Sequence, residues 1–162
     1  MIFVTVGTDT HDFSRLIKAM DEIAKSKKVI IQRGNTSYLP RNAESFGFTS
    51  EKEMNELYKK ADIIVTHAGA GSIINSLNYG KRPIVVPRLK QFDEHTDNHQ
   101  LETAAFMNSR RLVIGILDVN DIKGIVEKGP FKIEKKKRGS GITKYLEEWL
   151  NAHFSSQSTI SD

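Results

Sequence analysis

The chain has 162 residues, no cysteine and a formal net charge of +4, with 38% hydrophobic and 27% charged residues. This composition is that of a soluble globular chain, and it excludes a disulfide framework, a Cys-based zinc site and a Cys nucleophile, while no apolar run reaches the ~20 residues of a membrane span. The length suits one domain with its own core rather than a complete two-domain enzyme, and the missing cysteines are consistent with a reducing cytoplasm.

Apolar strands and amphipathic helices alternate along the first half of the chain. We expect strands at Ile2–Val6 and Val29–Ile31, and a short strand at Phe46–Phe48. Ser50 and Glu53 form a capping box that predicts the start of a helix. Spacings of three and four residues predict an earlier helix between the first two strands, with one apolar face made of Phe13, Leu16, Ile17, Met20 and Ile23.

The same alternation continues through the second half. Asp62–Thr66 is a β-branched run followed by a turn of small residues and a helix that ends near Gly80, and Pro83–Pro87 and Leu112–Leu117 predict two further strands. Asp118–Glu127 predicts a short helix, and a longer one before it carries Leu101, Ala104 and Ala105. Because the strands are continuous apolar runs, the pattern predicts an α/β fold with a doubly wound, mostly parallel sheet of about six strands.

The C-terminal segment differs in composition from the rest. Lys135–Arg138 is a run of four basic residues, for which a solvated loop is a simpler interpretation than contact with anionic lipid, and we expect no nucleic-acid partner. A last predicted helix carries an apolar face that includes Trp149, either as core packing, the default, or as a docking face. We expect a single domain over residues 1–154 and a disordered polar tail over residues 155–162.

A turn of small residues joins the fourth predicted strand to its helix, and it consists of Gly69, Ala70, Gly71 and Ser72. A turn of this kind offers free backbone N–H groups and the positive end of a helix dipole, which together bind phosphate. The alternative is a tight turn that only permits close packing, with Ser72 as the N-cap. Neither a full G-x-G-x-x-G motif nor a P-loop is present, so both interpretations stay open.

Other small or polar residues follow neighbouring strands. Gly7 and Thr8 end the first strand, and His67 ends the fourth. Ligands of doubly wound sheets bind at the carboxyl ends of the strands, so these residues are candidates for lining the same cleft. The alternative is that they only fix turns, with His67 as a half-buried structural histidine.

A polar segment follows the fifth predicted strand. His95 and His99 are four residues apart, but the H-E-x-x-H order and a further ligand are missing, so we expect no metal site. Asn98 and Gln100 carry paired donors and acceptors that suit sugar or ribose hydroxyls. The sequence therefore makes this segment, His99 included, a candidate for contact with a polyhydroxy ligand.

Taken together, these motifs resemble the C-terminal domain of glycosyltransferase family 28. They look most like its stand-alone form, the donor-binding subunit of two-chain N-acetylglucosaminyltransferases of lipid-linked oligosaccharide synthesis and of bacterial exopolysaccharide and capsule transferases. The resemblance covers roughly residues 1–130. The matching segments are Phe3–Thr8, Ala61–Ser72, Gly80–Pro83 and Asp97–Glu102.

The resemblance implies a Rossmann-like domain that forms one half of a GT-B enzyme and binds a UDP-linked sugar, with neither metal nor resident cofactor. Carried over to this chain, Gly69–Ser72 and Thr8 face the donor diphosphate, and Asn98 and Gln100 face the sugar or ribose. Asn75 stands where the family often has a ribose-binding glutamate, a departure that leaves the nucleotide open.

The resemblance also implies a division of labour between two chains. A membrane-associated partner would hold a lipid-linked glycan acceptor and the catalytic base, and would recruit this cytoplasmic chain for inverting hexosyl transfer. Two other functions stay open. One is a nucleotide-binding module without transferase activity, and the other is a small homo-oligomeric hydrolase or epimerase, whose acid or base would be His11, His67, His95 or His99.

Overall fold

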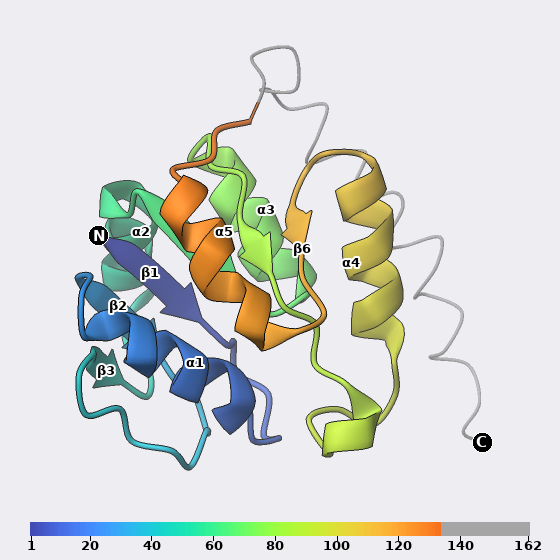
Figure 1. Cartoon of the computed structure of the whole chain (residues 1–162), viewed down its shortest axis with the longest axis horizontal. Helices are drawn as coiled ribbons and strands as arrows, with labels where there is room; N and C mark the ends of the chain where they lie inside the picture. Colours follow the sequence, from blue (N-terminus) through green and yellow to red (C-terminus); the bar gives the residue numbers. More distant parts are fainter. Residues whose placement is uncertain (134–162) are drawn as a thin grey trace.

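The computed structural model describes residues 1–133 of the chain. Its centre is one six-stranded sheet in the order β3-β2-β1-β4-β5-β6, with every neighbouring pair of strands parallel (Figure 1). The strands are β1 (Ile2–Thr5), β2 (Val29–Gln32), β3 (Glu44–Phe46), β4 (Ile63–Thr66), β5 (Ile84–Val85) and β6 (Ile114–Gly115). The predicted α/β fold with about six strands is thereby confirmed.

Helices cover both faces of the sheet. They are α1 (Ser14–Ala24), α2 (Glu51–Lys60), α3 (Ala70–Asn78), α4 (His99–Ser109) and α5 (Ile122–Lys128), with short 3-10 turns η1 (Lys90–Phe92) and η2 (Val119–Asp121). Val4 and Val65 pack with α1 and α5 on one face, whereas Phe3 and Ile64 pack with α2 on the other. This alternation of buried side chains along each strand is why the strands read as unbroken apolar runs.

The winding of the chain reverses between β1 and β4. These two strands are paired neighbours, with Thr5 opposite Thr66, although Thr66 comes 61 positions later in the sequence. β2 and β3 continue the sheet on one side, and β5 and β6 continue it on the other. The loops after Thr5 and Thr66 therefore leave the sheet side by side at its carboxyl edge, which is where doubly wound folds bind ligands.

Local signals place most element ends. Ser50 and Glu53 form the predicted capping box of α2, and Gly80 follows α3 with a positive φ of 70°. The Nζ of Lys81 donates to the last carbonyls of α2, at Tyr58, Lys59 and Ala61. Lysine is favourable at this negative end of a helix dipole. Gly80 thus ends α3, and Lys81 stabilises the C-terminal end of α2.

Five boundary or burial predictions were wrong. The third strand is Glu44–Phe46 rather than Phe46–Phe48, because the backbone turns away after pairing with β2 and leaves Phe48 57% exposed. Ala105 points to solvent, and Met107 takes the buried position on α4. The predicted Asp118–Glu127 helix is split into η2 and α5. The predicted strands Pro83–Pro87 and Leu112–Leu117 are each only two residues long.

Some predictions lie outside the described residues. These are the basic run Lys135–Arg138, the last helix with Trp149, the domain end at residue 154 and the tail over residues 155–162. Within residues 1–133, no helix combines the length and the apolar character needed to cross a bilayer.

A buried carboxylate on α1 fixes the connection from β2 to β3. Asp21 is 2% exposed and accepts hydrogen bonds from the Tyr38 hydroxyl and from the backbone N–H groups of Arg41, Asn42 and Ala43, at 2.8 to 3.0 Å. Burial would raise the pKa of Asp21, but these hydrogen bonds outweigh it and hold the pKa below its ordinary value of 3.8. The contribution of Asp21 to stability is therefore present above pH 3.8 and is lost as the pH falls below it.

We expect Asp21→Asn to lower the free energy of unfolding by about 2 kcal/mol at pH 7, because the charged acceptor of several backbone donors is lost. Urea denaturation monitored by circular dichroism measures this change. Glu22→Gln is the matched control, since Glu22 is exposed and forms an ion pair with Lys25, an interaction worth less than about 1 kcal/mol. Equal losses in the two variants would contradict the role given to Asp21.

Candidate functional site

A cavity of about 530 Å³ opens at the carboxyl edge of the sheet, where the winding reverses. One wall comes from the loop after β1, the end of β4 and the first turns of α3, and the opposite wall comes from the loop before α2 and from α2 itself. The structure brings most of the predicted site residues together here, namely Gly7, Thr8, His67, Gly69, Gly71, Ser72 and Asn75.

The N-terminus of α3 opens into this cavity. Its N-cap is Gly69 rather than Ser72, so the interpretation of Ser72 as the N-cap was wrong and the side chain of Ser72 lies in the first turn. Within the described part of the chain no side chain caps this end, and the first turn has no acidic residue. A Cβ added at Gly71 would meet no described atom within 4 Å. The partial positive charge of the helix end therefore faces open space.

The floor of the cavity is a buried imidazole enclosed by two glycines. His67 is 8% exposed, and a Cβ on Gly7 would lie 2.6 Å from its Cε1, with a Cβ on Gly69 closer still. Burial, reinforced by the positive charge of Arg88, lowers the pKa of His67 to about 4. The imidazole is thus neutral at pH 7, with one ring nitrogen as donor and the other as acceptor.

A buried carboxamide holds the loop after β1 against the loop after β3. The Oε1 of Gln32 accepts from the Thr5 hydroxyl at 2.7 Å and from the Gly7 N–H at 3.2 Å. Its Nε2 donates to the carbonyls of Gly7 and Gly47, each at 3.0 Å. Sequence reasoning missed this residue, although a glutamine that ends an apolar strand run is a signal for a buried polar partner.

A fully buried arginine joins the loops after β1 and β5. The guanidinium of Arg88 donates to the backbone carbonyls of Val6, His11, Asp12 and Glu94 at 2.9 to 3.3 Å. It also lies over the Phe13 ring, 4.6 Å from the ring centroid. Sequence analysis missed this role, because a single arginine after an apolar run reads as the start of a surface loop.

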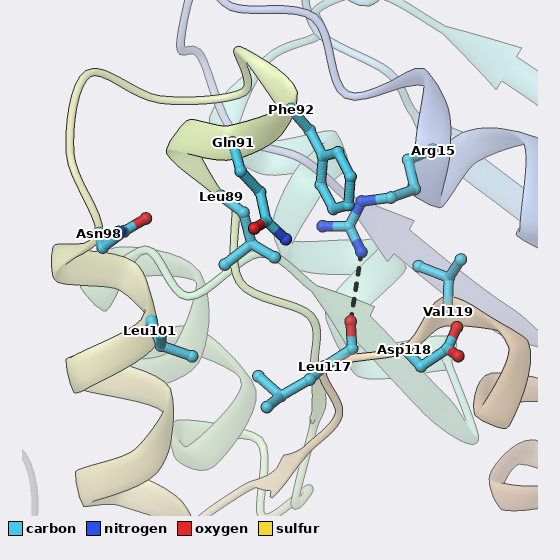
Figure 2. A pocket seen from close by; sticks show the side chains of 9 residues that line it. All are labelled: Arg15, Leu89, Gln91, Phe92, Asn98, Leu101, Leu117, Asp118 and Val119. Atoms are coloured by element: carbon cyan, nitrogen blue, oxygen red, sulfur yellow. Dashed lines mark hydrogen bonds between the residues drawn. The ribbon is translucent and has the colours of Figure 1, made fainter.

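The carboxamides of the Asn98 and Gln100 pair are directed to different places. Gln100 uses its Oε1 to accept from the N–H groups of Ala68 and Arg88, at 3.2 and 3.1 Å. Asn98 accepts from the Lys90 N–H at 3.2 Å and lies in a second cavity of about 500 Å³, shown in Figure 2. The structure thus separates Asn98 from the α3 N-terminus, and Gln100 bridges the β4 and β5 loops.

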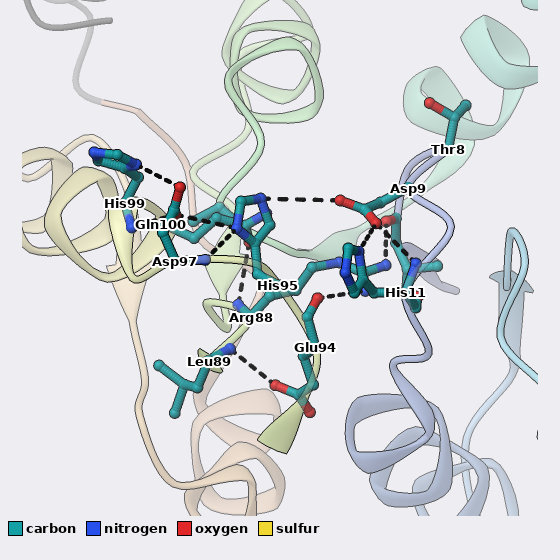
Figure 3. A network of polar contacts seen from close by, with 12 residues as sticks. Thr8, Asp9, His11, Arg88, Leu89, Glu94, His95, Asp97, His99 and Gln100 are labelled. Atoms are coloured by element: carbon teal, nitrogen blue, oxygen red, sulfur yellow. Dashed lines mark hydrogen bonds and ion pairs between the residues drawn. The ribbon is translucent and has the colours of Figure 1, made fainter. Parts of the chain in front are cut away.

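Alternating carboxylates and imidazoles run along the edge of the site (Figure 3). Asp9 lies 2.7 Å from the Nδ1 of His11 and 3.9 Å from the Nε2 of His95. Asp97 lies 3.1 Å from the Nδ1 of His95 and 2.8 Å from the Nδ1 of His99. Burial would raise the pKa values of both aspartates, but hydrogen bonds from His11 to Asp9 and from His99 to Asp97 hold them below the ordinary value.

The arrangement of these histidines does not follow from their spacing in the sequence. His95 lies in the loop before α4, which begins at His99, so the two side chains share no helix face. In residues 1–133, no group of three or more acidic or histidine side chains has the arrangement of a metal site. The row of Asp and His side chains instead ties the loop after β1 to the loop before α4.

The low pKa of His67 gives the protein a specific acid sensitivity. Below its ordinary pKa of 6.5 an unfolded His67 takes up a proton, whereas the folded protein resists protonation until about pH 4. Between pH 7 and pH 4.5 we therefore expect the wild type to lose about 2 kcal/mol more unfolding free energy than His67→Gln. Urea denaturation across this range measures the difference, and parallel pH profiles would contradict it.

Comparison with known proteins identifies the family. Residues 1–114 match the family model described as glycosyltransferase family 28 C-terminal domain. The chain is 33% identical over 114 residues to the human UDP-N-acetylglucosamine transferase subunit ALG13, an alignment that covers 64% of this chain and 10% of that protein. It is 35% identical over 135 residues to the subunit of the same name from Yarrowia lipolytica, covering 73% of this chain and 66% of that one.

A solved structure supports the same fold. The crystal structure of the glycotransferase of kitacinnamycin superposes with a TM-score of 0.56 at 16% sequence identity, covering 91% of this chain and 38% of the other. At this identity the likeness concerns the fold alone. The family model, in contrast, spans well over half of the chain, and the protein therefore belongs to the glycosyltransferase family 28 C-terminal domain family.

Proposed function

We propose that this chain is the donor-binding subunit of a UDP-sugar glycosyltransferase. The observation that carries the proposal is the uncapped N-terminus of α3, which opens into a cavity of about 530 Å³ at the point where the winding reverses. Two relatives whose names describe UDP-N-acetylglucosamine transferase subunits support the choice of donor. The chain spans about a tenth of the human relative and two thirds of the Yarrowia one.

In this proposal the donor diphosphate occupies the α3 end of the cavity. The backbone N–H groups of the first helical turn and the Ser72 hydroxyl donate to its oxygens from one side, and Thr8 does so from the loop after β1. Neutral His67 lines the floor of the cavity without placing a full charge there. Gly71 leaves room for the phosphate to approach the backbone.

The other wall suits a nucleoside. Phe48 is 57% exposed and, with Met54, gives the cavity an apolar surface for the face of a base. Asn75 lies one turn after Ser72 on α3 and carries a carboxamide that can both donate to and accept from ribose hydroxyls. We therefore assign the nucleoside to the side of the cavity that α2 forms.

Transfer then follows as an inverting displacement. An acceptor hydroxyl attacks the anomeric carbon as the bond from that carbon to the diphosphate oxygen breaks, and the bonding electrons leave with the nucleoside diphosphate. The α3 N-terminus stabilises the negative charge that develops on the leaving group. The hydroxyl proton passes to a base on the partner chain. This step needs no metal ion in the proposal.

The proposed partner is a membrane-associated chain that holds a lipid-linked glycan acceptor and recruits this chain to the cytoplasmic face of the membrane. This chain would then be one half of a GT-B enzyme. A second candidate is a nucleotide-binding module without transferase activity of its own. It is favoured by Asn75, which replaces the ribose-binding glutamate expected from the family resemblance.

Binding of the donor is tested by Gly71→Val. The added side chain would fill the space that the diphosphate needs, so we expect affinity for UDP and for UDP-sugars to fall at least about tenfold. Isothermal titration calorimetry with UDP, UDP-glucose, UDP-galactose and UDP-N-acetylglucosamine measures this loss.

The matched control for that experiment is Gly124→Val. Gly124 lies in α5, and a Cβ there would likewise meet no described atom within 4 Å. This control should bind as the wild type does. Unchanged affinity in Gly71→Val would mean that the nucleotide sits elsewhere.

Division of the enzyme between two chains is tested by reconstitution. We expect sugar transfer from radiolabelled UDP-sugar to a lipid-extractable product only when this chain is combined with membranes that contain the partner. Gly71→Val should abolish the transfer and Gly124→Val should preserve it. Full transfer by the purified chain alone would contradict the two-chain proposal, and donor binding without transfer in the combined system would favour the binding module.

A further inference from the structure

The second cavity lies at the same edge of the sheet as the donor cavity but over different strands. Leu89 follows β5 and Leu117 follows β6, and the two side chains line about 500 Å³ of space beside the start of α4. Two strand spacings, or about 10 Å, separate the gap between β5 and β6 from the gap between β1 and β4. A substrate whose diphosphate lies at α3 would therefore have to extend along this edge of the sheet to reach the second cavity.

An exposed aromatic ring forms one side of this cavity. Phe92 is 51% exposed although it is a phenylalanine, and the guanidinium of Arg15 lies over its ring, 4.9 Å from the centroid (Figure 2). A cation over one face of an aromatic ring stabilises its orientation. The ring thus presents a fixed apolar surface at the carboxyl edge of the sheet.

The positive charge of Arg15 beside the Phe92 ring is neutralised by an ion pair with Glu94. Arg15 donates from Nε and a terminal nitrogen to the two carboxylate oxygens of Glu94, each at 2.8 Å. Its terminal nitrogens also donate to the carbonyls of Pro87 at 3.0 Å and Leu117 at 3.4 Å. Because most of its N–H groups already donate to these oxygens, this guanidinium has few free donors for an anion. The cavity accordingly favours an uncharged ligand.

Polar groups with spare hydrogen-bonding capacity surround the apolar surface. Gln91 makes no hydrogen bond within residues 1–133, and Asn98 uses only its Oδ1, to accept from Lys90. Asp118 accepts through one carboxylate oxygen from Asn120, which leaves the other oxygen for a hydroxyl. Apolar carbon in the middle and both donors and acceptors at the rim complement a ring with an apolar C–H face and equatorial hydroxyls.

We propose that this cavity binds an uncharged pyranose ring, which packs its C–H face on Phe92 and directs hydroxyls toward Gln91 and Asn98. This inference rests on the proposed function, which supplies such rings from two sources: the sugar of the donor and the glycan of the acceptor. Both sources share the same chemistry. The rival use of an exposed phenyl ring is a contact with a protein partner.

Two variants test the proposal on the full chain. Phe92→Ala removes the stacking surface, and Gln91→Leu removes a donor and an acceptor at nearly constant volume. Because both side chains are exposed, the thermal midpoints should match that of the wild type. Leu39→Ala is the control, since Leu39 is 63% exposed and lines neither cavity.

Two measurements distinguish a pyranose ring of the donor from a pyranose ring of the acceptor glycan. Calorimetry compares UDP with UDP-glucose, UDP-galactose and UDP-N-acetylglucosamine, and saturation-transfer NMR follows free methyl glucosides and galactosides. If the ring belongs to the donor, Phe92→Ala weakens a UDP-sugar about fivefold and leaves UDP unchanged. If it belongs to the acceptor, the free glycosides lose their signals in Phe92→Ala while affinity for the UDP-sugar is unchanged.

The proposal is overturned if Phe92→Ala and Gln91→Leu leave both UDP-sugar affinity and glycoside signals as in the wild type. Weaker association with the partner chain in that case would assign Phe92 to a protein contact instead. Failure of the proposed function is a separate result, because it would appear as wild-type protein that binds neither UDP nor any UDP-sugar. Glycoside signals that depend on Phe92 would still support the cavity in that case.

Discussion

The buried guanidinium of Arg88 is the interaction on which both cavities depend. A charge removed from water costs several kcal/mol unless its donors are paired. Here the two terminal nitrogens donate to four backbone carbonyls from two loops, whereas the buried Nε has no partner among the described residues. If those loops separated, the guanidinium would lose hydrogen bonds while it stayed buried, or it would become exposed to solvent. Arg15 and Glu94 extend the same connection outward to Phe92. One buried cation therefore sets the position of the two loops that contribute to the cavity at the α3 N-terminus and to the cavity beside Phe92.

Much of the scaffold follows from local sequence. Runs such as Ile63–Thr66 are apolar on both faces because helices cover both sides of the sheet, and this is the pattern that predicts parallel strands. The capping box at Ser50 and the glycine after α3 mark helix ends through their own side chains and dihedral angles. The Gly69–Ser72 turn was recognisable for the same reason, because it consists of small residues that are adjacent in the sequence.

The parts that sequence reasoning missed depend on contacts between distant segments. Arg88 bonds to carbonyls about 80 residues earlier, and a contact of this kind leaves no periodic trace in the chain. Asn98 and Gln100 look equivalent as polar neighbours, yet the start of α4 directs one to Lys90 and the other to Ala68 and Arg88. Which face of a loop a side chain occupies is decided by tertiary packing, so adjacent carboxamides could not be assigned separately.

The enclosure of His67 by Gly7 and Gly69 has a consequence for how this sequence can vary. The same imidazole leaves no room for a side chain at either glycine. The three positions therefore form one steric unit at the ends of two neighbouring strands, β1 and β4, that are far apart in the sequence. A larger residue at Gly69 requires a smaller residue in place of the histidine, whereas Gly7 is also fixed by its positive φ of 76°. Substitutions at His67 and Gly69 are therefore strongly epistatic, and their order along an evolutionary path matters, because the imidazole has to change before Gly69 can.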